Sequence, residues 1–171
     1  MSILTKKSVL VTGGTGSIGT ALVKKAITDK AKLIRVFSND ENGLYEMESK
    51  FGNYKNIEYV ICDIQNEEIV AEIVKNIDII FHAAALKHVD RCELNPLETI
   101  NVNIMGTKNI AKAAQKENVQ KMIFISTDKA VNPIGVMGAT KLLGEKLISA
   151  ESSHKSNTIF ASVRFGNVFN P

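Results

Sequence analysis

Residues 9–22 read VLVTGGTGSIGTAL, and this stretch is the strongest indication of the fold. An apolar, β-branched run leads into Gly13, Gly16 and Gly19, spaced as GxxGxxG, and a helical pattern follows. Gly13 permits a tight turn, Gly16 lets a pyrophosphate approach the backbone, and Gly19 lets the helix pack closely on the sheet. Glycines also occur in ordinary turns, but this motif lies between the first strand and the first helix. The stretch therefore predicts a dinucleotide-binding turn, with the anion at the helix N-terminus near Ser17.

The same alternation of strand and helix continues along the chain. Short β-branched runs predict strands over 8–12, 33–37, 57–61, 78–82, 122–126 and 159–164. Helical patterns occur near 17–29, 42–51, 67–75, 96–117 and 138–151. Runs such as IDIIF and KMIFI are continuously apolar, as in parallel strands buried on both faces. We therefore predict one α/β domain over residues 1–171: a doubly wound Rossmann sheet of six parallel strands, order 3-2-1-4-5-6, with helices on both faces.

Composition narrows the class of protein. The 171 residues are 44% hydrophobic and 23% charged, as in ordinary globular proteins. The net charge of +3 is spread along the chain, so no nucleic-acid partner is expected. The chain has neither an apolar run of about 18 residues nor a signal peptide, so we expect no membrane association and a cytoplasmic location. Cys62 and Cys92 lie outside any metal-binding spacing, so a reducing compartment and no metal site are expected.

The choice of cofactor depends on the end of the second predicted strand, in LIRVFSNDE. NAD-selective sites place an acidic residue there to accept a hydrogen bond from the ribose 2′-OH. Ser38 occupies that position, followed by Asn39 and Asp40, and a hydroxyl with an amide suits the 2′-phosphate of NADP. Position 39 lacks an arginine, and Asp40 could turn inward to suit NAD. Alternatively, these residues only start a turn and cap a helix. The cofactor expected is NADP, with NAD as the alternative.

Three further segments lie where a ligand is expected, beyond the carboxyl ends of strands. HAAALKH follows strand four, STDKAVNP follows strand five, and RFGNV follows strand six. Asp128 and Lys129 are adjacent at a strand end and could form an acid and base pair, each changing the pKa of the other. The alternative is an ion pair in a solvated loop.

With these motifs the chain resembles the extended short-chain dehydrogenase/reductase superfamily. Within it, the chain is most similar to the UDP-N-acetylglucosamine 4,6-dehydratases of polysaccharide biosynthesis, the CapD-like family. The combination of STDKAVNP with MGATK is specific, and the similarity extends from TGGTGSIG to VRFGNV. It implies a UDP-sugar substrate, a tightly bound dinucleotide that acts as a recycled hydride carrier, and a homo-oligomer. It also implies that residues 1–171 are the Rossmann portion and that the family's C-terminal substrate domain is absent from them.

The resemblance assigns roles to individual residues. Thr127 matches the catalytic hydroxyl, Asp128 the acid that protonates the departing C6 hydroxyl, Lys129 the base that removes the C5 proton, and Lys141 the lysine that contacts the nicotinamide ribose. Predicted cofactor-binding residues are Gly13, Thr15, Gly16, Ser17, Ile18, Gly19, Ser38, Asn39, Asp40, Asp63, Ile64, Ala83, Ala84, Ala85, Lys87, Asn103 and Lys141. Predicted substrate-binding residues are Lys87, His88 and Asn167.

The chain departs from the superfamily at Met137. Short-chain dehydrogenases usually carry a tyrosine there, four residues before the lysine on the same helix face. A thioether cannot exchange a proton, so Asp128, Lys129 or Thr127 with water would have to act at O4. A methionine at helical spacing is otherwise core filler. The alternatives to a dehydratase are a catalytically silent dinucleotide-binding module and a UDP-sugar epimerase. His82 and His88 are expected to have packing or hydrogen-bonding roles.

Overall fold

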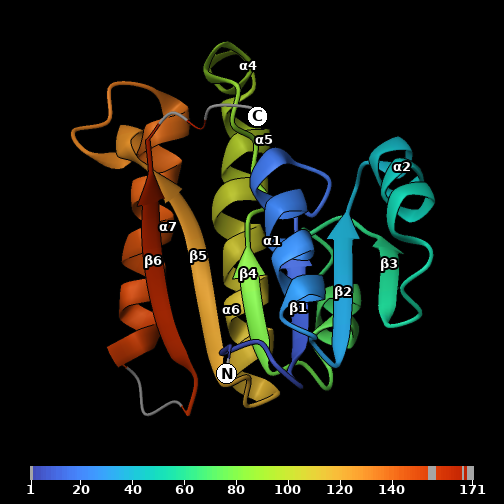
Figure 1. Ribbon diagram of the computed structural model, residues 1–171. Coiled ribbons are helices and arrows are strands. Elements are labelled where there is room, and N and C mark those ends of the chain that lie inside the picture. Colours follow the sequence, from blue (N-terminus) through green and yellow to red (C-terminus); the bar gives the residue numbers. More distant parts are fainter. Residues whose placement is uncertain (1, 154–156, 167, 169–171) are drawn as a thin grey trace.

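The computed structural model describes residues 2–153, 157–166 and 168, and its centre is a six-stranded sheet (Figure 1). The strand order is β3-β2-β1-β4-β5-β6 and every neighbouring pair is parallel. The strands are β1 (Ser8–Thr12), β2 (Leu33–Ser38), β3 (Ile57–Ile61), β4 (Ile79–His82), β5 (Lys121–Thr127) and β6 (Ile159–Phe165). The predicted doubly wound sheet is therefore confirmed, and strand ends differ from the predicted ones by one residue at most.

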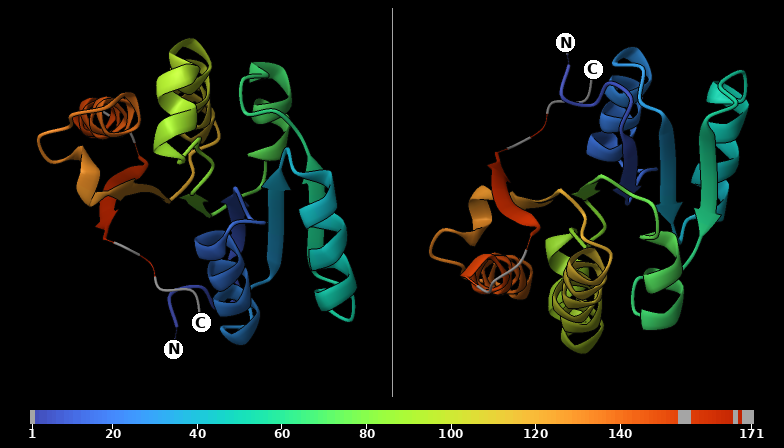
Figure 2. Two further views of the ribbon diagram at one scale, coloured as in Figure 1. Left: turned by 90° about the horizontal axis from the view of Figure 1, so that it is seen from above. Right: turned by 90° about the horizontal axis from the view of Figure 1, so that it is seen from below.

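Helices cover both faces of this sheet. They are α1 (Ser17–Thr28), α2 (Glu41–Phe51), α3 (Glu67–Ile73), α4 (Val89–Leu94), α5 (Pro96–Ile100), α6 (Gly106–Lys116) and α7 (Val136–Ser153). Figure 2 shows α1 and α2 on one face, and α3, α6 and α7 on the other. Two shorter elements are a π-helical segment, η1 (Asn101–Met105), and a 3₁₀ turn, η2 (Asp128–Ala130).

Each face of the sheet has its own hydrophobic core, because side chains alternate along every strand. Val9 and Val11 pack with α1 and α2, through residues such as Val23 and Leu44. Leu10 points to the other face, where the core also contains residues of α3, α6 and α7. This arrangement explains why the central strands are apolar at consecutive positions.

The helical stretch predicted near 96–117 is confirmed, but its middle is π-helical rather than α-helical. The structure divides this stretch into α5, η1 and α6. A π-helical segment carries an extra residue per turn and often lies at a functional site. Here it places Asn103 in the interior, 1% exposed, where its side chain bonds to the loop after β4. α4, a short helix without a long apolar repeat, was not predicted. Among the described residues, no helix is both long and apolar enough to cross a membrane.

Candidate functional site

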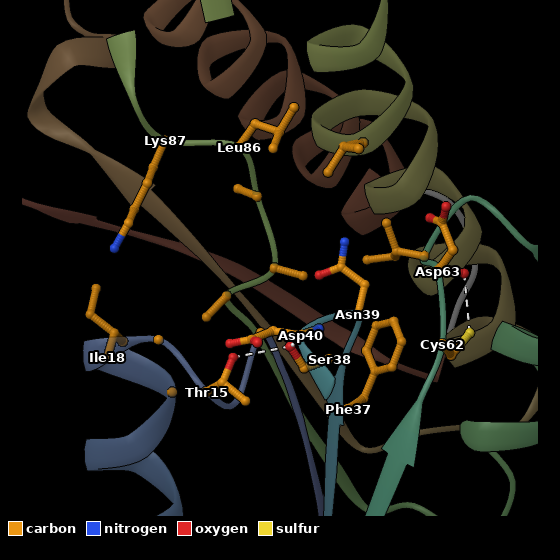
Figure 3. A pocket seen from close by; sticks show the side chains of 18 of the residues that line it. Thr15, Ile18, Phe37, Ser38, Asn39, Asp40, Cys62, Asp63, Leu86 and Lys87 are labelled. Carbon is orange, nitrogen blue, oxygen red and sulfur yellow. Dashed lines mark hydrogen bonds between the residues drawn. The ribbon is translucent and has the colours of Figure 1, made fainter. Parts of the chain in front are cut away.

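A cavity of about 450 Å³ lies at the carboxyl ends of the strands, between the β1–α1 turn and the loops after β2, β3 and β4 (Figure 3). Most predicted cofactor residues line it, namely Gly13, Thr15, Gly16, Ser17, Ile18, Gly19, Ser38, Asn39, Asp40, Asp63, Ile64, Ala83, Ala84, Ala85 and Lys87. The lining also includes residues that the sequence analysis did not single out: Phe37, Cys62, Gln65, Leu86, Glu98, Val102 and Val168. Of these, Phe37, Cys62, Gln65 and Leu86 adjoin predicted residues, whereas Glu98 and Val102 are brought in by the helical region that follows α4.

The glycine turn is shaped to bring a phosphate against the backbone. Gly13 has φ +64°, and a Cβ there would lie 2.7 Å from the backbone nitrogen of Ala84. A Cβ on Gly19 would lie 2.2 Å from the carbonyl oxygen of Gly13, so the helix can approach this closely only without one. At Gly16 the nearest atom, again the Gly13 oxygen, would be 3.5 Å away, and the residue faces the cavity.

The N-terminus of α1 completes the anion site. No side chain caps the helix at Gly16, and its first turn contains no acidic residue. Neither a capping side chain nor a carboxylate in the first turn therefore neutralises the partial positive charge of the helix end. The unbonded N–H groups of this turn can donate to a pyrophosphate. The turn and the helix thus fit the diphosphate of a dinucleotide, as the sequence predicted.

The end of β2 forms a hydrogen-bonded turn. The Ser38 hydroxyl is buried, lies 3.0 Å from the Thr15 hydroxyl and accepts a bond from the Asp40 backbone N–H at 3.1 Å. The Asp40 carboxylate accepts a bond from the Gly43 N–H at 3.0 Å and so caps α2. The capping interpretation of this segment is therefore confirmed. Asp40 nevertheless lines the cavity, so the same residue remains available to a ribose.

A polar edge lies at the end of the cavity formed by the loop after β3. The Asp63 carboxylate accepts a bond from the Gln65 backbone N–H at 2.9 Å. The Gln65 amide donates to Glu98 at 2.9 Å and reaches Asp63 at 3.3 Å. This edge therefore offers carboxylate oxygens that can accept bonds from an amino group such as that of adenine.

The predicted acid and base lie at the end of β5. Thr127 donates a bond to Asp128 at 3.0 Å, and Lys129 Nζ lies 3.6 Å from the same Asp128 oxygen. The hydrogen bond from Thr127, and next the charge of Lys129, lower the pKa of Asp128. Side chains of both residues are about half exposed, at 56% for Asp128 and 49% for Lys129. They therefore form an ion pair in a solvent-accessible loop, and neither of them lines the cavity.

Lys141 is a buried cation on α7. It is 7% exposed, and its Nζ lies 4.4 Å from the centre of the Phe124 ring. Burial lowers the pKa of Lys141 to about 8, and the charge of Glu145 acts in the opposite direction. Within residues 2–153, 157–166 and 168, Lys141 Nζ has no hydrogen-bond acceptor, and Lys141, although predicted to bind the cofactor, lies outside the cavity lining.

Helix α7 and the loop that carries Lys129 are tightly packed. A Cβ on Gly138 would lie 2.3 Å from the carbonyl oxygen of Lys129. This contact brings the Asp128–Lys129 pair to the first turn of α7, three residues before Lys141. Met137, in the same turn, is 6% exposed, which agrees with a packing role.

The remaining predicted residues differ in their surroundings. His82 is fully buried and hydrogen-bonded to two threonines, which confirms the structural role expected for it. A packing or hydrogen-bonding role is expected for His88; the residue is exposed at the N-terminus of α4, so it has no packing role, its side chain makes no capping bond there, and it lies outside the cavity lining. Asn103 is also outside the lining, because its amide is bonded to both backbone groups of Leu86. Asn167 lies outside the described residues.

Comparison with known proteins agrees with this architecture. Residues 9–171 match the family described as polysaccharide biosynthesis protein. The uncharacterized membrane protein MJ1061 of Methanocaldococcus jannaschii is 47% identical over 166 residues, which cover 96% of this chain and 50% of that protein. The UDP-glucose 4-epimerase of Rickettsia bellii is 44% identical over 168 residues, covering 95% of this chain and 49% of the relative.

A solved structure, that of Pen from Bacillus thuringiensis, superimposes with a TM-score of 0.94 at 43% identity, over 98% of this chain and 52% of the other. The chain thus spans about half the length of these relatives. The match over residues 9–171, the relatives above 40% identity and the shared fold lead to one conclusion: this chain belongs to the polysaccharide biosynthesis protein family.

Proposed function

We propose that this chain is the dinucleotide-binding domain of a nucleotide-sugar 4,6-dehydratase that acts on a UDP-N-acetylglucosamine-type substrate in surface-polysaccharide synthesis. The observation that carries the proposal is the packing of the Lys129 loop on Gly138, which brings the Asp128–Lys129 pair to the helix of the buried Lys141. The resemblance assigns the acid and base roles to this pair, and the cavity at the carboxyl ends of the strands has a glycine turn that suits a diphosphate, which supports the proposal.

The cavity fits a nicotinamide dinucleotide, which supplies a reversible hydride acceptor when bound. Gly16 and the start of α1 would hold its diphosphate, Asp63 its adenine, and Lys141 its nicotinamide ribose. We propose NADP on account of Ser38 and Asn39. NAD is the alternative that Asp40 supports. A 2′-phosphate would need a cation beside it, and the only cationic side chain in the described lining, Lys87, extends from the β4–α4 loop toward Ile18 (Figure 3).

The chain's own residues would carry the proton transfers of an elimination. Once C4 is a ketone, the C5 proton is acidic, and Lys129 in its amine form would remove it. Asp128 in its acid form would protonate the C6 hydroxyl, which leaves as water. The Thr127 bond favours the ionised form of Asp128 in the ligand-free chain. Substrate binding must therefore desolvate this carboxyl group and raise its pKa for the acid role.

Proton NMR in D₂O tests the reaction directly. The protein is incubated with NADP⁺ or NAD⁺ and UDP-N-acetylglucosamine. A new C6 methyl signal with deuterium incorporation is the expected result. We expect Lys129→Met and Asp128→Asn to lower turnover by about 100-fold or more. Neither residue lines the cavity, so the dinucleotide dissociation constant should stay within about twofold of wild type.

Two other outcomes would replace this proposal. If the dinucleotide binds and the sugar is unchanged, the chain acts as a binding module, which Met137 in place of an acid–base group favours. If the product is the C4 epimer without a C6 methyl signal, the chain belongs to an epimerase, the activity named for the Rickettsia bellii relative.

A further inference from the structure

The proposed function gives no role to the buried polar residue His82. His82 is the last residue of β4, is 0% exposed, and has its ring 5.6 Å from that of Phe124. Burial, and next the charge of Lys141, lower the pKa of His82 to about 3. Its other close partners are the neutral hydroxyls of Thr12 and Thr107. The imidazole is therefore neutral at physiological pH, with one ring nitrogen protonated and the other not.

The neighbouring hydroxyl groups decide which ring nitrogen carries the proton. Thr107 donates its only hydroxyl proton to the carbonyl oxygen of Asn103 at 2.7 Å. Its contact with His82 Nε2, at 2.9 Å, must therefore be one in which Nε2–H donates. Nδ1 then lacks a proton and accepts from the Thr12 hydroxyl at 2.7 Å. Thr12 in turn accepts from the Ala84 N–H at 3.2 Å. These hydrogen bonds form one series in which every bond is donated in the same direction, from the Ala84 N–H to the Asn103 carbonyl oxygen.

This series of hydrogen bonds ends at two residues, Ala84 and Asn103, that belong to or hold the loop lining the cavity. Ala84 is held by Thr12. Leu86 is held by the side-chain amide of Asn103, whose oxygen accepts from the Leu86 N–H at 2.8 Å and whose nitrogen donates to the Leu86 carbonyl oxygen at 3.0 Å. Ala84 also packs against Gly13, where a Cβ would lie 2.7 Å from the Ala84 nitrogen. A displacement of Ala84 would therefore be transmitted directly to the turn that faces the diphosphate.

We propose that His82 is a positioning residue for the dinucleotide: its imidazole, held as the Nε2–H tautomer between Thr12 and Thr107, orders the Ala83–Lys87 loop and through it the glycine turn. The proposal rests on the proposed dinucleotide site. It assigns no contact between His82 and the ligand, and the effect of His82 on binding passes through Ala84 and Leu86.

The first test concerns the tautomer and is independent of any ligand. Two-dimensional ¹H–¹⁵N NMR of the protein labelled with ¹⁵N-histidine reports the protonation of each ring nitrogen, with His82→Phe used for assignment. We expect a neutral Nε2–H ring that does not titrate between about pH 5 and pH 8. An Nδ1–H ring, or one that becomes charged in this range, would overturn the hydrogen-bond chain.

The second test uses a matched pair at Thr107, since His82→Phe can fail for reasons of folding alone. Thr107→Ser keeps the hydroxyl, and Thr107→Val removes it with little change in volume. We expect the dissociation constant for NAD⁺ or NADP⁺, measured by calorimetry well below the melting temperature, to rise about tenfold or more in Thr107→Val. In Thr107→Ser it should stay within about threefold of wild type.

Equal affinity in Thr107→Val, Thr107→Ser and wild type, with a lower melting temperature in Thr107→Val, would show a purely structural role and overturn the positioning proposal. If the wild-type protein binds neither dinucleotide, the proposed function fails, and the positioning role, which presupposes that ligand, fails with it. The tautomer, measured without ligand, would still show whether the hydrogen-bond chain itself exists.

Discussion

Gly13 and Gly16 belong to one motif, but they have different roles in the structure. Gly13 needs its positive φ of +64° and lies against Ala84, so its role is conformational. Gly16 has an ordinary backbone, with φ −70°, and a Cβ there would meet the Gly13 oxygen only at 3.5 Å, an ordinary contact, so its role concerns the ligand. The GxxGxxG motif predicts these two roles, and the backbone angle of Gly13 and its contact with Ala84 give the first of them a physical basis.

Gly13→Ala and Gly16→Ala should therefore affect different properties. We expect Gly13→Ala to lower the free energy of unfolding by about 2 kcal/mol or more, from the left-handed backbone and the collision with Ala84. Gly16→Ala should change it by less than about 0.5 kcal/mol and weaken dinucleotide binding about tenfold. Urea unfolding and calorimetry check the two effects, and wild-type affinity in Gly16→Ala would contradict the assigned phosphate site.

The residue at position 39 offers a test of cofactor preference. Asn39 lines the cavity next to Asp40 and carries no charge. An arginine there would pair with the 2′-phosphate of NADP. Asn39→Arg is expected to improve NADP⁺ affinity relative to NAD⁺ by about tenfold, with Asn39→Gln as the uncharged control. Dissociation constants of both dinucleotides measure this ratio, and an unchanged ratio would place the 2′-position elsewhere.

The buried Lys141 should make stability depend on pH in a defined direction. Burial lowers its pKa from 10.5 to about 8, so the unfolded chain binds more protons than the folded one between these values. Stability from this group therefore rises with pH from about 8 to 10.5 and is lost as pH falls through 8. At pH 7 the buried charge is a cost.

Lys141→Met is accordingly expected to raise the free energy of unfolding of the ligand-free protein by about 1 to 3 kcal/mol at pH 7. The difference from wild type should shrink toward pH 10, and dinucleotide affinity should fall. Denaturant unfolding of both proteins at pH 7 and near pH 10 measures this change. A variant less stable than wild type at pH 7 would show that the charge is compensated by a partner.

Among the secondary-structure elements, β6 is a largely exposed edge strand. It pairs with β5 at one edge of the sheet, and of its seven residues only Phe160 is buried. Glu145 of α7 ties the strand down: it accepts bonds from Arg164 at 2.8 and 2.6 Å and from Ser126 of β5 at 2.5 Å. The bidentate pair therefore joins a helix to the edge strand close to the Asp128–Lys129 loop.

Removing the charge of Glu145 should loosen this end of the sheet. The hydrogen bond from Arg164, mainly, lowers the pKa of Glu145 below its ordinary value of 4.5. The stabilisation is thus complete above about pH 4.5 and is lost as pH falls through the folded-state pKa. We expect Glu145→Gln to cost about 1 to 2 kcal/mol at pH 7, with a smaller difference from wild type at pH 3.

Lys146→Gln, at the exposed neighbouring position on α7, is the matched control for Glu145→Gln. It should change stability by less than about 0.5 kcal/mol, because Lys146 has no part in this network. Urea titrations at both pH values compare the three proteins. If Glu145→Gln lowers the free energy of unfolding by the same amount at pH 7 and pH 3, the packing of the side chain, rather than its charge, stabilises this contact.

For the whole molecule, the cavity joins parts of the chain that are distant in sequence, from Gly13 to Val102. A ligand that binds only this assembled edge must stabilise the folded state by mass action. Dinucleotide at about 100 times its dissociation constant should raise the free energy of unfolding by about 2.7 kcal/mol. Hydrogen exchange should show protection in the loops after β1, β2, β3 and β4, and not in β6. Protection concentrated in α7 and β6 would place the ligand at a different site.

The six-stranded parallel sheet could be predicted from the sequence alone. Parallel strands buried on both faces are apolar at consecutive positions, and a Rossmann turn needs glycine at fixed positions between the first strand and the first helix. Most of the cavity lining between Gly13 and Lys87 could also be predicted, since carboxyl ends of parallel strands share one edge, but Phe37, Cys62, Gln65 and Leu86 were missed. Tertiary contacts were needed to show the π-helical segment at Asn101–Met105, the burial of Lys141 on Phe124 and the hydrogen bonds of His82 with Thr12 and Thr107. These depend on contacts between residues far apart in the chain, such as Asn103 with Leu86 and Thr12 with His82, and local periodicity carries no information about them.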